Sequence, residues 1–304
     1  MTERHVAVVG TTASGKSALA LALAHRRRDL EIVSIDSMQV YRGMDIGTAK
    51  PTLEERAEVP HHLIDVVEPD EDFTVARFQR LFVDVLAAIE ARGHRALLVG
   101  GTGLYLRAAI DGLVIPGRYP DARRELDGEP TGVLHERLLA LDPIGATRVT
   151  ATNRRRIVRA LEVTLGSGRP FSSFGPGLEA YPPTAFRLVG IALPPNVVAA
   201  RVEARYHRQI ADGFVDEVRR LLARPRGLSR TAAQALGYKE LAAHLAGRMT
   251  LEEALDQAVR RTRQFARRQR AWFRRDPRIE WLHVESDPSE ARTALEQIVS
   301  GAVP

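Results

Sequence analysis

The feature that most constrains this chain is a short motif framed by glycines near its amino terminus, Gly10-Thr11-Thr12-Ala13-Ser14-Gly15-Lys16-Ser17. It matches the pattern G-x-x-x-x-G-K-[ST] and lies between a β-branched run, residues 5–9, and a helical pattern, residues 16–28. In that context backbone N–H groups surround phosphate oxygens, the helix N-terminus and the lysine add positive potential, and the serine hydroxyl can bind Mg²⁺. The motif therefore predicts a P-loop for linked phosphates within a strand–loop–helix unit.

Alternating strand and helix patterns follow the motif. Short β-branched runs predict strands at residues 31–35, 61–67 and 95–99, and a long helical pattern runs from about Thr74 to Ala91. Strands that alternate with helices form a parallel sheet, whose ligands bind at the carboxyl ends of the strands. We therefore expect the binding site at that edge of the sheet.

The alternation stops between residues 113 and 183. Several prolines and glycines lie at both ends of this stretch. The residues between them show helical patterns and no convincing strand pattern. Two further runs, 186–193 and 279–284, predict strands. The chain is therefore divided into a core segment (1–112), an inserted helical subdomain (113–183), and a returning strand with C-terminal helices (184–304). The predicted fold class is α/β, a P-loop-type parallel sheet flanked by helices, with an inserted helical subdomain.

Composition narrows the functional classes. The 304 residues are 44% apolar, which suffices for a core, and contain no cysteine, which excludes disulfides, thiol nucleophiles and cysteine metal sites. A net charge of +6 favours an anionic partner. No run reaches the roughly 18 apolar residues that a membrane span needs. We expect a monomeric cytoplasmic protein that binds no membrane.

Polar residues follow the second predicted strand, in the segment Asp36-Ser37-Met38-Gln39. At the edge where the P-loop also opens, a carboxylate, a hydroxyl and a carboxamide can accept a proton and read the polar edge of a planar base. Asp-Ser after a strand is equally typical of an ordinary turn or helix cap. The residues alone leave both interpretations open.

A nucleotide hydrolase also needs an acidic residue at the end of a hydrophobic strand, to hold Mg²⁺ and position water. The run 95–99 ends instead in Gly100-Gly101-Thr102-Gly103. Asp36 and Asp65 remain substitutes, so the pattern weakens a hydrolase without excluding it.

Arginines gather in three places. Arg201 and Arg205 lie one helical turn apart, which suits bidentate binding of phosphate, although they are also spaced to pair with acids such as Glu203. Residues 260–275 contain eight arginines and no acid, and the positions 260, 263, 267, 270 and 274 share one helical stripe. A third cluster, Arg154–Arg156 with Arg159, lies in the insertion. The stripe within residues 260–275 favours a nucleic-acid backbone over a solvated face, and the cluster in the insertion offers a second basic region for it.

Seven segments stand together in a distinctive order: GTTASGKS (10–17), DSMQVYRGMDIGTAKP (36–51), HHLIDVVEP (61–69), FTVARF (73–78), VGGTGLYLRA (99–108), RRRIVRALEV (154–163) and RQFARRQRAWFR (263–274). This series resembles the tRNA dimethylallyltransferase family, also called tRNA isopentenyltransferases or IPP transferases. The resemblance runs from about residue 5 to residue 285. It implies transfer of a dimethylallyl group from dimethylallyl diphosphate to N6 of the adenosine just 3′ of the anticodon.

The resemblance also implies roles for individual residues. Catalysis would involve Asp36 as the base, Thr102 and Lys16. The diphosphate would be held by the loop residues Gly10, Thr11, Thr12, Ala13, Ser14, Gly15, Lys16 and Ser17, with Arg201 or Arg205 above it, and Ser17 would bind the cofactor Mg²⁺. The tRNA anticodon stem-loop would contact Asp36, Ser37, Met38, Gln39, Thr102, Arg123, Arg155, Arg156, Ile157, Val158, Arg159, Arg263, Arg267 and Arg270. Two rival functions remain, an ATP-dependent small-molecule kinase and an RNA-binding NTPase.

Overall fold

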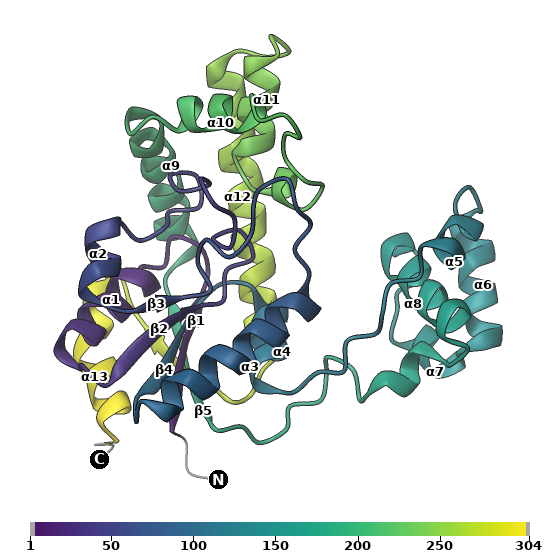
Figure 1. Ribbon diagram of the computed structural model, residues 1–304, viewed down its shortest axis with the longest axis horizontal. Coiled ribbons are helices and arrows are strands. Elements are labelled where there is room, and N and C mark those ends of the chain that lie inside the picture. Colours follow the sequence, from purple (N-terminus) through teal and green to yellow (C-terminus); the bar gives the residue numbers. More distant parts are fainter. Residues whose placement is uncertain (1–3, 302–304) are drawn as a thin grey trace. The chain divides into compact units, whose positions relative to one another are not determined.

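The computed structural model describes residues 4–301 and contains a six-stranded, entirely parallel sheet (Figure 1). Its strands are β1 (His5–Gly10), β2 (Leu30–Ser34), β3 (His61–His62), β4 (Arg95–Gly100), β5 (Phe186–Ala192) and β6 (Ile279–His283). They are ordered β3-β2-β4-β1-β5-β6 across the sheet. Every residue of β1 and β2 is buried, as expected for a parallel sheet covered on both faces. The predicted fold class is confirmed.

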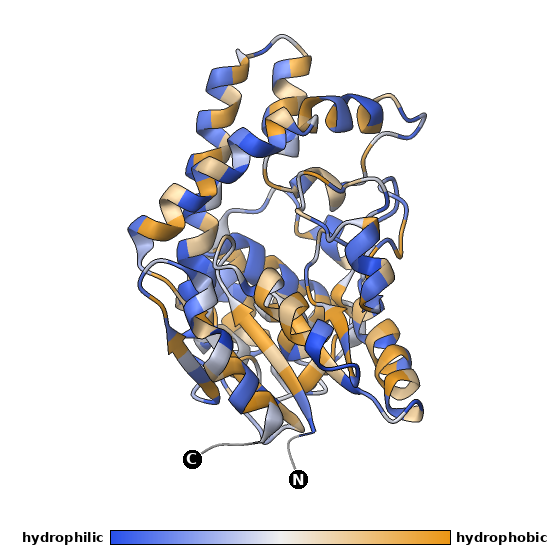
Figure 2. Cartoon of the chain, turned by 90° about the vertical axis from the view of Figure 1, so that its left-hand side faces the viewer, coloured by the Kyte–Doolittle hydropathy of each residue, from blue (hydrophilic) through white to orange (hydrophobic). Residues whose placement is uncertain are grey.

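Helices flank this sheet. They are α1 (Lys16–Arg26), α2 (Leu53–Glu58), α3 (Val75–Ala91), α4 (Gly103–Ile110), α9 (Pro195–Ala211), α10 (Phe214–Leu222), α11 (Tyr238–Leu245), α12 (Leu251–Phe273) and α13 (Arg292–Ser300). The helix α1 packs against β2 and β4, α3 packs against β4, and α12 packs against β1 and α9. Figure 2 shows the hydrophobic colouring concentrated along the central strands. The core therefore lies between the sheet and these helices.

The predicted strand at residues 61–67 is shorter than expected. Only His61 and His62 pair with β2, because Leu63 and Asp65 adopt φ angles of +60° and +55° that end the strand. The turn carries the Asp65 carboxylate to Lys50, whose Nζ donates to it at 2.5 Å, and to Arg56, at 2.6 Å. Long-range ion pairing overrides the local β-branched pattern here.

Residues Gly112–Pro182 form a separate compact unit, and the rest of the described chain forms the other. The smaller unit contains α5 (Pro120–Glu125), α6 (Thr131–Leu141), α7 (Pro143–Thr147) and α8 (Arg154–Ser167), followed by a 3₁₀ turn (Phe171–Phe174), and no strand among its described residues. It has its own apolar core. Ile157 and Val158 lie in that core, 0% and 5% exposed, so their side chains do not face solvent, and the predicted tRNA contact at these positions stays a prediction.

A buried carboxylate stabilises the start of β2. Glu31 accepts hydrogen bonds from Arg92 Nε and Nη2 at 2.9 and 2.8 Å, from His62 Nε2 at 2.6 Å and from His94 Nδ1 at 2.8 Å. Burial alone raises the pKa of this carboxyl, but the hydrogen bonds from Arg92, His62 and His94 outweigh burial and lower the pKa of Glu31 to about 2. The ionised form is therefore strongly preferred in the folded protein.

Replacing Glu31 with glutamine is expected to lower the free energy of unfolding at neutral pH by about 2–3 kcal/mol, because its charged partners lose their acceptor. The pKa of Glu31 is lower in the folded chain than its ordinary value of 4.5, so its contribution is complete above that value and disappears as the pH falls towards 2. Urea denaturation at several pH values checks this. If the free energy of unfolding fell by the same amount on acidification in E31Q as in the unsubstituted protein, the prediction would be wrong.

Candidate functional site

The P-loop connects β1 to α1 at the carboxyl edge of the sheet. Gly15 begins α1 with a φ of +80°, and a Cβ built on it would lie 2.3 Å from Pro288, so this position requires glycine. Lys16 Nζ donates to Thr11 O at 3.1 Å, and Ser17 is exposed in the first helical turn. The loop therefore joins a strand to a helix, as the motif predicts.

A cleft of about 920 Å³ opens beside the loop. At one end it is lined by Thr12, Lys16 and Ser17, with three arginines of α9, Arg201, Arg205 and Arg208. Asp36 and Gln39 line it from the end of β2, together with residues 48–52, and Leu21, Ile32 and Ile64 supply an apolar wall. The predicted phosphate loop and the predicted carboxylate therefore face the same space.

The loop end of this cleft is positively charged. Burial lowers the pKa of Lys16 to about 8, an effect that Asp36 opposes and Arg205 reinforces. Burial also lowers the pKa of Arg205, whose Nη1 donates to Thr12 Oγ1 at 2.9 Å while its Nε has no acceptor among the described residues. Arg201 Nε donates to Ala13 O at 2.9 Å and is more exposed. Both arginines reach the loop, and Arg205 lies deeper.

The segment after β2 forms the opposite side of the site. Asp36 Oδ1 accepts from Met38 N at 2.8 Å, and Thr102 Oγ1, from the turn after β4, accepts from Ser37 N at 3.2 Å. Met38 is partly buried against the core. The structure thus brings Asp36, Ser37 and Thr102 together, although Ser37 and Thr102 adjoin the cleft without lining it.

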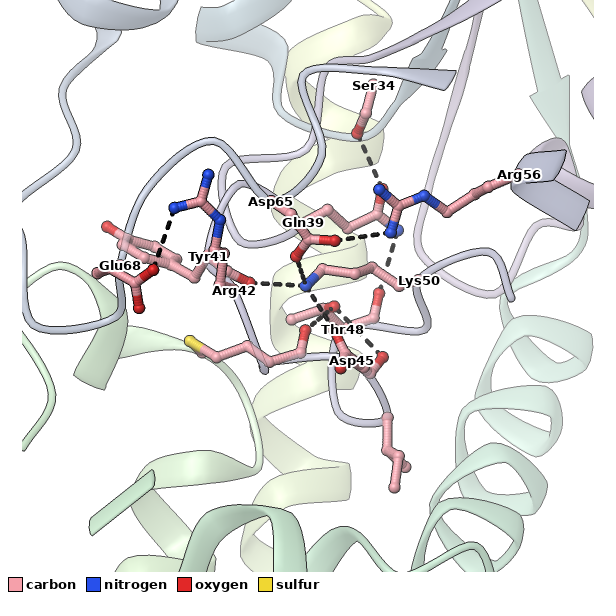
Figure 3. Close-up of polar contacts among 12 residues, drawn as sticks. Ser34, Gln39, Tyr41, Arg42, Asp45, Thr48, Lys50, Arg56, Asp65 and Glu68 are labelled. Carbon is pink, nitrogen blue, oxygen red and sulfur yellow. Dashed lines mark hydrogen bonds and ion pairs between the residues drawn. The ribbon is translucent and has the colours of Figure 1, made fainter. Parts of the chain in front are cut away.

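The carboxamide of Gln39 is held at both ends (Figure 3). Its Oε1 accepts from Ser34 Oγ at 2.8 Å, and its Nε2 donates to Thr48 O and Ala49 O at 3.3 and 3.2 Å. Asp65, the other acid considered as an Mg²⁺ ligand, is paired with Lys50 and Arg56 and does not line the cleft. Asp36 is therefore the acid of the two that faces the loop.

A further residue of the site, which the sequence patterns do not indicate, is Gln269, a buried residue of α12. Its Oε1 accepts from Thr12 N at 2.8 Å and its Nε2 donates to Gly101 O at 2.8 Å, so one side chain joins the P-loop to the turn that carries Thr102. A Cβ on Gly101 would lie 2.2 Å from Gln269. The available signal was a polar residue in register with the buried positions Thr262, Ala266 and Phe273 of the helix.

Groups outside residues 260–275 bond to part of the arginine stripe of α12. Because α12 packs against α9, Arg263 Nη2 donates to Glu203 Oε2 at 2.7 Å, and Arg270 Nη2 donates to Leu193 O at 2.7 Å. Acids outside residues 260–275, Glu203 and Asp256, therefore compensate part of the stripe. Three positions of the stripe remain exposed, namely Arg260, Arg267 and Arg274.

The basic cluster of the smaller unit also divides into paired and exposed members. Arg159 Nη1 and Arg123 Nη1 both donate to the buried Glu162, at 2.8 and 3.4 Å. Arg155 and Arg156 are exposed at the start of α8. These two arginines are the members of the cluster that are most accessible to a large anion.

Fold and site together define an α/β protein of the P-loop type, in which the glycine-rich loop and a carboxylate face one cleft. A model of the family described as IPP transferase matches residues 39–276. The chain therefore belongs to the IPP transferase family. No helix within residues 4–301 is long and apolar enough to cross a membrane.

Individual relatives agree with this family. The chain is 46% identical to a tRNA dimethylallyltransferase of a Nocardioides species, over 97% of this chain and 96% of that one. It is 50% identical to a tRNA dimethylallyltransferase of Geobacter metallireducens, over 92% of each chain. The crystal structure of a full-length tRNA isopentenylpyrophosphate transferase from Bacillus halodurans matches with a TM-score of 0.72 and 36% identity, covering 99% of this chain and 97% of that one.

Replacing Gln269 with alanine is expected to weaken binding of inorganic diphosphate about tenfold, because Thr12 N and Gly101 O lose the partner that fixes the loop, at about 1–3 kcal/mol. Isothermal titration calorimetry measures this affinity. Gln264, exposed on the same helix, supplies the matched control Q264A, which should bind diphosphate normally. Equal affinities for Q269A and Q264A would show that Gln269 does not shape the phosphate site.

Proposed function

We propose that this chain transfers a dimethylallyl group from dimethylallyl diphosphate to N6 of the adenosine just 3′ of the anticodon in tRNA, with release of diphosphate. One observation carries the proposal: Asp36 faces the cationic group of Lys16 and Arg205 within one cleft. Curated relatives that match nearly the whole chain are named for this activity. Their identity to this chain supports the same chemistry here.

The donor fits the loop end of the cleft. Loop N–H groups, Lys16 and Arg205 would bind the diphosphate, since the cleft holds these cations with no carboxylate bonded to either among the described residues. Binding a polyanion raises the pKa of Lys16 from about 8, so the bound donor favours its charged form. The apolar wall of Leu21, Ile32 and Ile64 would take the hydrocarbon part.

The chemistry of Ser17 fits Mg²⁺. Its exposed hydroxyl, in the first turn of α1 beside the phosphate site, is an oxygen ligand of the kind this ion prefers, with diphosphate oxygens and water completing the set. Bound Mg²⁺ would neutralise part of the charge on the leaving diphosphate.

Transfer requires one bond to form and one to break. The N6 nitrogen of adenine attacks the primary allylic carbon, the carbon–oxygen bond to diphosphate breaks, and its electron pair leaves with diphosphate. Asp36 accepts the proton that N6 releases, and diphosphate remains in the loop beside Lys16. An aromatic amine is a weak nucleophile. The cleft would therefore align this amine with the allylic carbon, and the carboxylate of Asp36 would contribute by accepting its proton late in the step.

Each of the two units would contribute exposed arginines to RNA binding. Arg260, Arg267 and Arg274 on α12, and Arg155 and Arg156 on α8, would contact phosphates of the anticodon stem-loop and recognise its shape. The target base would leave its stack to reach Asp36, as in other enzymes that modify a base.

Purified protein with dimethylallyl diphosphate and an adenosine-bearing anticodon stem-loop should release diphosphate and yield a prenylated base, detected by mass spectrometry. Asp36→Asn should lower kcat about 100-fold or more while the Kd for the stem-loop stays within about twofold, because only proton acceptance is lost. Asp84→Asn, at an exposed position of α3, is the control. ATP cleavage without prenylation would support the kinase or NTPase instead.

Replacing Arg260, Arg267 and Arg274 together with alanine should weaken stem-loop binding and reduce the slope of log K against log salt, by about 1 for each RNA phosphate that the protein no longer neutralises. Binding titrations at several salt concentrations measure the slope. Alanine at Arg26 and Arg28, exposed at the C-terminal end of α1, removes charge away from the cleft and should leave the slope unchanged. Equal slopes in both variants would argue against α12 as the RNA surface.

A further inference from the structure

The cleft wall beside Gln39 is an irregular loop, Asp45–Lys50, that forms no helix or strand. Thr48, Ala49 and Lys50 line the cleft directly. Two turn bonds of its own backbone, from Ala49 N to Ile46 O and from Lys50 N to Asp45 O, satisfy part of its polar groups, and side chains from elsewhere bond others. The structure shows which side chains do so.

Glu217 of α10 is the main support. This side chain belongs to a residue that is only 2% exposed. Its Oε2 accepts from Asp45 N at 2.9 Å and Ile46 N at 2.7 Å, and its Oε1 accepts from Gly47 N at 3.2 Å and Tyr238 Oη at 2.6 Å. Three consecutive backbone amides thus share one carboxylate, and bonds to an ionised acceptor are the stronger kind. The buried carboxylate of Glu217 does not destabilise the fold, because all four donors bond to it.

Lys50 fixes the other end of the loop (Figure 3). Its Nζ donates to Tyr41 O at 2.6 Å, Asp45 Oδ1 at 2.6 Å and Asp65 Oδ1 at 2.5 Å, which uses all three of its donors. Thr48 Oγ1 also donates to Met44 O at 2.6 Å. Both ends of the loop are therefore held by charged groups.

The held loop in turn sets the orientation of Gln39. Two carbonyl groups, Thr48 O and Ala49 O, accept from Gln39 Nε2, so the amide nitrogen must face the loop. The oxygen Oε1 then faces the hydroxyl of Ser34, which also accepts from Asp36 N at 3.3 Å. A displaced loop would release the carboxamide to rotate. Contacts therefore run from α10 through the loop to the residues beside Asp36.

We propose that Glu217 is a positioning residue for the nucleobase side of the reaction, holding Asp45–Lys50 so that Thr48 O and Ala49 O fix the Gln39 carboxamide. This inference rests on the proposed function and assigns that function a residue outside the cleft. The four bonds of Glu217 all lead to the loop or to Tyr238 and none to the P-loop, so donor binding does not depend on it.

Glu217→Gln tests the proposal, because an amide at this position places an NH₂ group against backbone N–H donors. We expect kcat/KM for the stem-loop to fall about tenfold or more, with the Kd for dimethylallyl diphosphate within about twofold of the unsubstituted protein. Glu31→Gln is the matched control, since Glu31 is also 2% exposed and also bonded on both oxygens, but at the start of β2. Assayed well below its unfolding temperature, E31Q should keep kcat/KM for both substrates.

A double-mutant cycle tests whether Glu217 acts through Gln39. If Glu217 acts through Gln39, E217Q should change kcat/KM about threefold or less in a Gln39→Ala background, whereas independent effects would multiply. If E217Q fails to fold, Tyr238→Phe removes one of the four donors and keeps the ring, and it should lower kcat/KM for the stem-loop by about two- to fivefold.

Three results would overturn the inference: stem-loop kcat/KM in E217Q equal to that in E31Q, an equally large loss of donor affinity, or full multiplication with Gln39→Ala. Absence of prenyl transfer by the unsubstituted protein would overturn the proposed function instead. The two failures are therefore distinguishable in one set of assays.

Discussion

A single buried carboxamide joins the two halves of the cleft. Gln269 binds Thr12 N of the P-loop and Gly101 O of the turn after β4, at 2.8 Å each, so the phosphate site and the segment that carries Thr102 keep a fixed spacing. The bond network continues from Thr102 Oγ1 to Ser37 N, next to Asp36. A group bound in the loop and a carboxylate after β2 can therefore act on one molecule, because neither side moves independently of α12.

The charges around the cleft are distributed unevenly. The carboxylates of Asp65, Glu217 and Glu31 all accept hydrogen bonds. Each accepts from at least three hydrogen-bonding groups or from two cations. Within residues 4–301, Lys16 and Arg205 bond only to a carbonyl and a hydroxyl, although burial lowers the pKa of both. Desolvated cations without an anionic partner are unfavourable in the free protein. An anionic ligand that supplies the missing charge gains affinity from this arrangement.

Local patterns were enough to predict the sheet and the P-loop, because β-branched runs and the glycine motif act over a few residues. They failed where distant residues decide the structure. The run 61–67 ends as a strand at His62 because Asp65 turns towards Lys50, and Arg263 finds Glu203 only because α12 packs against α9. The role of Gln269 could not be predicted for the same reason, since its partners lie 257 and 168 residues away in sequence.

The same packing keeps an acidic residue out of the turn after β4. A hydrolytic site would need an acid where β4 ends, but that turn is built of glycines in contact with other groups. A Cβ on Gly100 would lie 2.8 Å from the Ile35 backbone, and one on Gly103 would lie 2.1 Å from Trp272. A carboxylate at these positions would displace β2 or α12. An acid that lines the cleft instead follows the neighbouring strand β2, at Asp36.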